Sequence, residues 1–90
     1  MSMKPEILEI ERVETITYRK RPPILSVRAV VKGFDESVIL YVRGPLAQRL
    51  VEGGDPVDMV TRRLTGRAIV GIKEGRRAYR VIRVLASRRK

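Results

Sequence analysis

The segment from Ile24 to Lys32 (ILSVRAVVK) alternates apolar and polar side chains with a period of two residues. One face would carry Leu25, Val27, Ala29 and Val31, and the other would carry Ser26, Arg28 and Lys32. Successive side chains of a β-strand point to opposite faces, so this period predicts a strand with one buried face. We therefore expect a fold that is organised around a β-sheet.

A second strand is expected directly afterwards, from Ser37 to Arg43. Its apolar face would carry Val38, Leu40 and Val42. The connecting segment, Gly33 to Glu36, has the residue types of a turn. Two such strands joined by about four turn residues predict a β-hairpin.

The first strand is expected from Ile7 to Tyr18, where apolar and polar residues alternate except at Val13. This break in phase indicates either a β-bulge near Arg12 or two short strands. A helical period is also present, but the content of β-branched residues favours a strand. The segment from Arg19 to Pro23 ends it, because proline cannot donate a hydrogen bond to a strand ladder.

After Gly44 the spacing of the apolar residues changes from the period of a strand to that of a helix. Pro45 suits the first position of a helix, and Gly53-Gly54 provides its stop. The apolar stripe of this helix would consist of Leu46, Ala47, Leu50 and Val51.

A second helix is expected to begin at Asp55, with Asp55 as N-cap, Pro56 at the first position and Asp58 in the first turn. Its buried side would carry Val57, Val60 and Leu64. The sequence VDMVTRRL would also suit a strand.

The closing segment from Gly66 to Lys90 predicts a second hairpin. One strand would place Ala68, Val70 and Ile72 on one face. The turn would lie at Glu74-Gly75, and the last strand would run from Ala78 to Ala86. Arginine interrupts both faces of that last strand, so it is not cleanly divided into an inner and an outer side.

The expected fold is a small β-rich α+β domain with the order β-β-β-α-(α)-β-β. This order resembles the layout of the OB-fold, a five-stranded barrel with a helix between its third and fourth strands. The resemblance implies a scaffold that commonly binds nucleic acids. We expect residues 1–86 to form this single OB-like barrel domain and residues 87–90 to form a basic C-terminal tail.

The charge of the chain is unevenly distributed. The net charge of the ninety residues is +10. Residues 1–61 contain nine basic and nine acidic side chains, whereas residues 62–90 contain eleven basic side chains and one acidic one, Glu74. A rigid surface with this charge predicts binding to a polyanion.

Composition argues against an enzyme. Histidine and cysteine are absent, which removes the commonest general base and the thiolate metal ligands. A metal site at Glu52, Asp55 and Asp58 is conceivable, but helix capping explains both aspartates. We therefore expect no catalytic residues, no metal site and no cofactor.

The predicted nucleic-acid-binding residues lie in the closing hairpin and the tail. They are Arg67, Lys73, Arg76, Arg77, Tyr79, Arg80, Arg83, Arg88, Arg89 and Lys90. Arginine binds phosphate oxygens with two parallel hydrogen bonds, and a surface tyrosine such as Tyr79 or Tyr41 could stack on a base. The alternatives are that the tyrosines belong to the core and that the arginines pair with Glu6, Glu9, Glu11 and Glu14 of the first strand.

The favoured function is a non-enzymatic protein that contacts the phosphate backbone of DNA or RNA through the basic hairpin. The alternative is a structural or accessory subunit of a larger nucleoprotein assembly, such as a ribosomal component or a polymerase subunit, docked through its charge-neutral first two thirds. No apolar run reaches the ~20 residues that cross a bilayer. The N-terminus also lacks the apolar core of a signal peptide, so we expect a cytoplasmic protein without a membrane partner.

The composition also predicts a hyperthermophilic source, because asparagine and cysteine are absent, glutamine occurs once, and arginine and glutamate are abundant. We expect the protein to unfold well above about 60 °C, the upper range of mesophilic domains. A thermal melt followed by circular dichroism measures this, and a midpoint below that temperature would contradict the interpretation.

Overall fold

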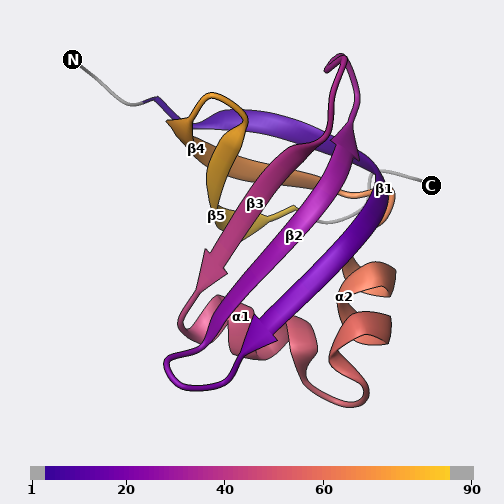
Figure 1. Cartoon of the computed structure of the whole chain (residues 1–90), viewed down its shortest axis with the longest axis vertical. Helices are drawn as coiled ribbons and strands as arrows, with labels where there is room; N and C mark the ends of the chain where they lie inside the picture. Colours follow the sequence, from indigo (N-terminus) through magenta and orange to yellow (C-terminus); the bar gives the residue numbers. More distant parts are fainter. Residues whose placement is uncertain (1–3, 86–90) are drawn as a thin grey trace.

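The computed structural model describes residues 4–85, which form a closed barrel of five strands with two helices between the third and fourth (Figure 1). The elements are β1 (Glu6–Arg19), β2 (Ile24–Val31), β3 (Val38–Arg43), α1 (Pro45–Val51), α2 (Pro56–Leu64), β4 (Ala68–Gly75) and β5 (Ala78–Val84). This confirms the predicted OB-like fold, including the second helix.

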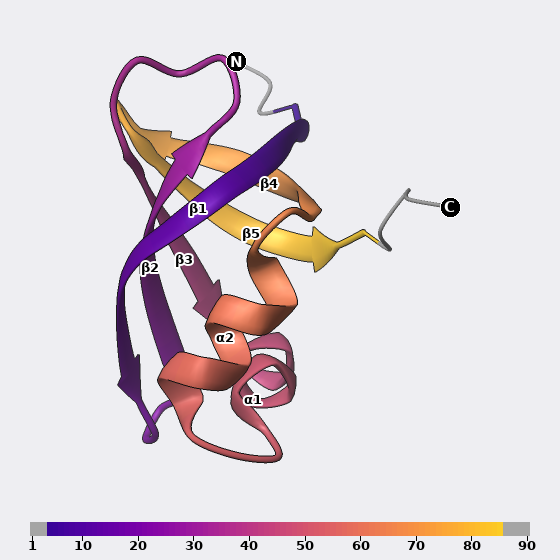
Figure 2. The same cartoon turned by 90° about the vertical axis from the view of Figure 1, so that its right-hand side faces the viewer.

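The barrel closes in the order β1-β2-β3-β5-β4, with β4 paired to β1. Every neighbouring pair is antiparallel except β3 and β5, which run parallel. Strand β1 joins both sides of the barrel. Its first residues, Glu6 to Glu9, pair with β4, and its remaining length pairs with β2. Figure 2 shows β1 curving across the barrel to reach both neighbours.

The bend in β1 coincides with two irregularities in its pairing with β2. The register shifts between Ile10 and Arg12 and again between Val13 and Thr15. A bulge adds a residue to one strand of a pair and increases its local bend and twist. The predicted bulge near Arg12 is confirmed, and it lies within one continuous strand.

The core is built from aliphatic side chains of every element. Leu25, Val27, Leu40 and Ile69 are completely buried. No charged side chain is buried among residues 4–85. The alternation in β2 and β3 therefore has the predicted cause, since one face of each strand packs into the barrel.

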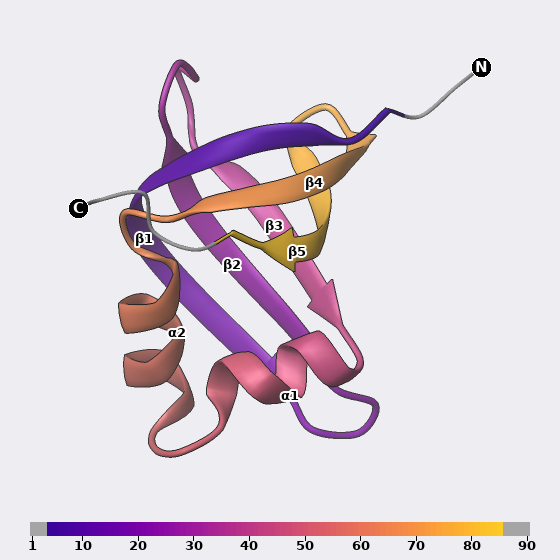
Figure 3. The ribbon, with the colours of Figure 1, turned by 180° about the vertical axis from the view of Figure 1, so that it is seen from behind.

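The helices cover one end of the barrel, below the strands in Figure 1 and again at the bottom of Figure 3. The predicted N-cap of α2 is confirmed, because the carboxylate of Asp55 accepts a hydrogen bond from the Asp58 N–H at 3.2 Å. Val60 and Leu64 are buried as expected. Val57 is not: its side chain is 49% exposed, because the barrel covers a narrower stripe of this short helix.

In the closing hairpin, the inner face of β4 carries Ile69 and Gly71. The row of Ala68, Val70 and Ile72 faces outwards and is half-buried. Gly71 faces the ring of Tyr79: a β-carbon at this position would lie 3.3 Å from Cβ of Tyr79. Glycine at position 71 thus lets the tyrosine pack closely against β4, and a larger residue would make this contact tighter.

The position of the core predicts that two substitutions of an aliphatic residue by alanine differ greatly in their effect on the free energy of unfolding. Leu40→Ala should lower the free energy of unfolding by about 2–5 kcal/mol, because Leu40 is completely buried and its removal leaves a cavity. Ile7→Ala should cost about 0.5 kcal/mol or less, since Ile7 is 66% exposed. Urea unfolding of both variants measures the difference, and similar values would contradict the assigned position of the core.

Candidate nucleic-acid interface

The basic side chains of the closing hairpin lie at two separate ends. Arg67 precedes β4 and Arg83 pairs with Val70, so both lie at the end near the helices. Arg76 and Arg77 connect the strands at the opposite end. The ends are about 25 Å apart, because the eight residues of β4 rise about 3.3 Å each. The predicted residues Arg88, Arg89 and Lys90 lie outside the described residues.

At the turn end, Arg77 forms an ion pair with Glu36 of the β2–β3 loop, with 2.7 Å between Nη1 and Oε1. Phe34 of the same loop packs edge-on against Tyr79, with 6.2 Å between ring centroids. Lys73 and Arg76 are exposed. The turn of the hairpin is thus tied to the β2–β3 loop through Arg77.

Arg80 lies on the outer face of β5 and is half-buried. Its Nε lies 3.3 Å from Oε2 of Glu74, and Nη1 of Arg43 lies 3.8 Å from the same oxygen. The Arg80 Nε is shielded from solvent and has no well-directed hydrogen bond, so its contact with Glu74 is mainly ionic. The only acidic residue of the basic segment therefore compensates two arginines on this face.

The prediction that Tyr79 stacks on a base from the surface is wrong. Its side chain is 3% exposed, and its hydroxyl donates to Oε1 of Glu6 at 3.3 Å. Burial raises the pKa of Tyr79, and the neighbouring carboxylate of Glu6 adds to this. The ring is part of the core and is not available for stacking on a base. Tyr41 lies on the outer face instead, half-buried, with the guanidinium carbon of Arg43 5.6 Å from its ring centroid.

Glu9 and Glu14 of β1 pair with residues other than the arginines of the hairpin. Glu9 lies 3.9 Å from Lys32, and Glu14 lies 3.3 Å from Arg12. Glu14 also accepts a hydrogen bond of 2.7 Å from the Ser37 hydroxyl, which lowers the pKa of its carboxyl group. Within residues 4–85, no glutamate of β1 forms an ion pair with the closing hairpin.

The other end of the hairpin borders a hollow of about 620 Å³. Four arginines line it, and we call it the four-arginine hollow: Arg49, Arg63, Arg67 and Arg83. The rest of the lining is aliphatic and consists of Leu46, Leu50, Ile82 and Val84. Among residues 4–85, no carboxylate forms an ion pair with any of the four arginines.

Backbone and side-chain contacts position these arginines. Nη1 of Arg63 donates to the carbonyl oxygen of Arg49 at 2.6 Å, which links α2 to the last turn of α1. The Arg67 N–H donates to the carbonyl of Leu64, and the Arg67 carbonyl accepts from the N–H of Ile10. Arg63 is therefore held against α1, and the backbone of Arg67 is held against α2 and β1, whereas Arg49 and Arg83 are exposed.

A bulge in β5 exposes Arg83 next to an apolar residue. The pairing with β4 passes from Val81 directly to Arg83 and leaves Ile82 as the extra residue. Ile82 is 44% exposed, and Arg83 follows it on the exposed surface. Beyond this point the inner face is continued by Val84, which packs against the core.

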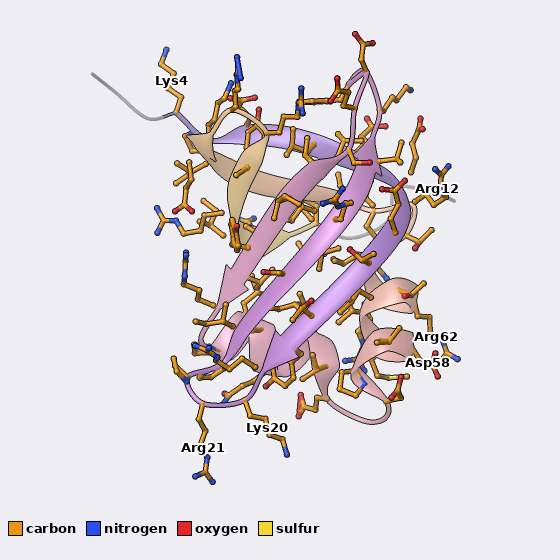
Figure 4. All side chains as sticks on the ribbon, viewed as in Figure 1. Lys4, Arg12, Lys20, Arg21, Asp58 and Arg62 are labelled. Carbon is orange, nitrogen blue, oxygen red and sulfur yellow. The ribbon has the colours of Figure 1, made fainter. Side chains whose placement is uncertain are left out.

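Sequence reasoning missed Arg49 and Arg63, because it followed charge along the chain and both residues come from helices. The available signal was their position in the last turn of a helix, where the dipole favours a cation. That signal does not show that the two helix ends meet β4 and β5. Figure 4 shows other basic residues pointing away from the barrel, including Lys20 and Arg21 of the β1–β2 loop and Arg62 of α2.

No protein-family model, curated protein or solved structure matches the chain. Within residues 4–85, neither helix has the length and apolar character needed to cross a membrane.

The contact between Arg63 and α1 predicts that Arg63 contributes more to the stability of the fold than the adjacent Arg62. Arg63→Met should lower the free energy of unfolding by about 1 kcal/mol, because it removes a hydrogen bond from a charged donor while retaining the apolar stem. Arg62→Met is the matched control and should change stability by about 0.5 kcal/mol or less, since Arg62 is exposed. Equal effects in chemical denaturation would show that the link does not stabilise the helices.

Proposed function

We propose that this protein is a non-enzymatic nucleic-acid-binding protein that contacts the phosphate backbone through its basic C-terminal third. The proposal rests on one observation: most of these positive charges have no ion-pair partner among the described residues of the protein. Of the eight basic residues from Arg62 to Arg83, only Arg77 and Arg80 form ion pairs within residues 4–85. The alternative, in which the glutamates of β1 neutralise the hairpin, finds no support in their contacts.

The physical basis of binding would be electrostatic. Each arginine that contacts a phosphate releases condensed counterions, so affinity should fall steeply as salt rises. The basic residues stand on a closed barrel, which holds them in place before binding and reduces the entropy lost on association. The two ends of the hairpin are separated by the length of about seven base pairs of duplex at about 3.4 Å each.

A second function is favoured by a separate observation. The charge-neutral part of the chain exposes Ile7 on β1 and Val57 on α2, with exposed fractions of 66% and 49%. Apolar side chains at the surface are typical of contacts with other proteins. The protein would then be an accessory or structural subunit of a cytoplasmic ribonucleoprotein or polymerase assembly. Co-purification of a stable complex from native extract favours this role, and an isolated monomer favours the first.

The main test is a binding panel of single- and double-stranded DNA and RNA at about 50 and 200 mM salt. A variant with Arg76, Arg77, Arg80 and Arg83 changed to Ala should bind every substrate more weakly. Its salt dependence should be shallower by about one unit of slope for each arginine that contacts a phosphate.

The matched control removes four charges elsewhere, at Lys4, Arg12, Lys20 and Arg21, all of which are exposed (Figure 4). It should retain most of the affinity. An equal loss in both variants would mean that net charge alone drives binding. Wild-type affinity that does not change with salt would contradict phosphate contacts altogether. Thermal melts check that the loss of the Arg77 and Arg80 ion pairs leaves each variant folded.

A further inference from the structure

We propose that the four-arginine hollow binds a nucleoside polyphosphate group, either as a nucleotide in solution or as the 5′ end of an RNA chain. The proposal rests on the proposed function only for the second of these two sources. It assigns a ligand to a surface that lies apart from the turn of the hairpin.

The positive charge of the hollow matches a ligand with several adjacent phosphates better than a ligand with a single phosphate. Four arginine residues line one space of about 620 Å³, and no carboxylate among residues 4–85 forms an ion pair with them. A phosphodiester of a nucleic-acid backbone carries one negative charge. A terminal phosphate carries up to about two, and a triphosphate about four. A nucleoside triphosphate therefore matches the charge of the hollow, whereas one backbone phosphate leaves most of it uncompensated.

The geometry of the arginines is suited to phosphate oxygens. Arg63 uses one N–H on the Arg49 carbonyl, and this hydrogen bond orients its planar group while leaving further donors. Arg49 and Arg83 are exposed and come from two different elements, α1 and β5. Guanidinium groups form paired, charge-assisted hydrogen bonds with phosphate, so such a set can hold several oxygens at once.

The apolar part of the lining suits the body of a nucleotide. Leu46, Leu50, Ile82 and Val84 border the same space, and Ile82 is 44% exposed. The volume lies within the range of about 300–1,000 Å³ that is typical of small-molecule sites. Within residues 4–85, arginine is the only type of polar side chain in the lining. We therefore expect the hollow to select for the number of phosphates more strongly than for the base.

The position of the hollow separates it from the outer face of β2 and β3, where OB-folds bind oligonucleotides. Figure 3 shows α1, α2 and the end of β5 turned towards the viewer, on the opposite side from the β2 and β3 strands that stand in front in Figure 1. The site is thus built from the helical end of the barrel and the last strand.

The test compares one RNA sequence with three 5′ ends: hydroxyl, monophosphate and triphosphate. Fluorescence anisotropy with a 3′-labelled oligomer should give at least about tenfold tighter binding for the triphosphate than for the hydroxyl, the factor that one charge-assisted hydrogen bond supplies. Arg49→Ala combined with Arg83→Ala should abolish this preference. Both residues are exposed, so the core of the barrel remains intact. Lys20→Ala combined with Arg21→Ala removes the same charge from the β1–β2 loop and should retain the preference.

Unlabelled GTP and ATP, added as competitors, identify the source of the ligand. Displacement of the triphosphate-ended RNA by millimolar nucleotide supports a nucleotide from solution, and a preference without displacement supports the chain end. Equal affinity for all three ends, together with salt-dependent binding of each, would overturn the inference and leave the proposed function standing. If no RNA or nucleotide binds but polyglutamate does, the ligand is an acidic protein and both proposals are wrong.

Discussion

The structure depends on the ability of β1 to pair with two strands that belong to opposite sides of the barrel. The strand has fourteen residues, and two shifts in register near its middle let it turn from β4 to β2. This closure gives every strand a paired neighbour on each side over at least part of its length, which shortens the rows of unpaired backbone groups that would invite aggregation. It also fixes the closing hairpin between β1 and β3, and so decides where each arginine of β5 lies.

The closure of the barrel also determines how the positive charges are distributed over its surface. An extended hairpin that wraps around a barrel cannot gather its basic residues in one place, so Arg76 and Arg83 lie at opposite ends. Two helices then cover the end near Arg83 and add arginines from the middle of the chain. The four-arginine hollow is therefore a product of tertiary structure, with members separated by up to thirty-four positions in sequence.

The parts of the fold with a regular period could be predicted from sequence. The strands around Leu25 and Leu40 and the capped start of α2 all follow local rules, and each lies where expected. Predictions failed where packing decides between faces. Tyr79 fills the space beside Gly71, and Val57 lies beyond the edge of the barrel. The bulge at Ile82 had no local signal either, because arginines on both faces of β5 conceal its phase.

The two basic surfaces differ in how their charge is balanced. On the outer face, Arg43 and Arg80 share Glu74, so part of the cost of bringing like charges together is already offset. In the hollow, four arginines adjoin one space with no acidic partner among the described residues, so their like charges are not offset there. One of the four guanidinium groups, that of Arg63, is held by a hydrogen bond to the end of α1. An anion that enters the hollow would offset these charges, so the proposed ligand should also raise the stability of the fold.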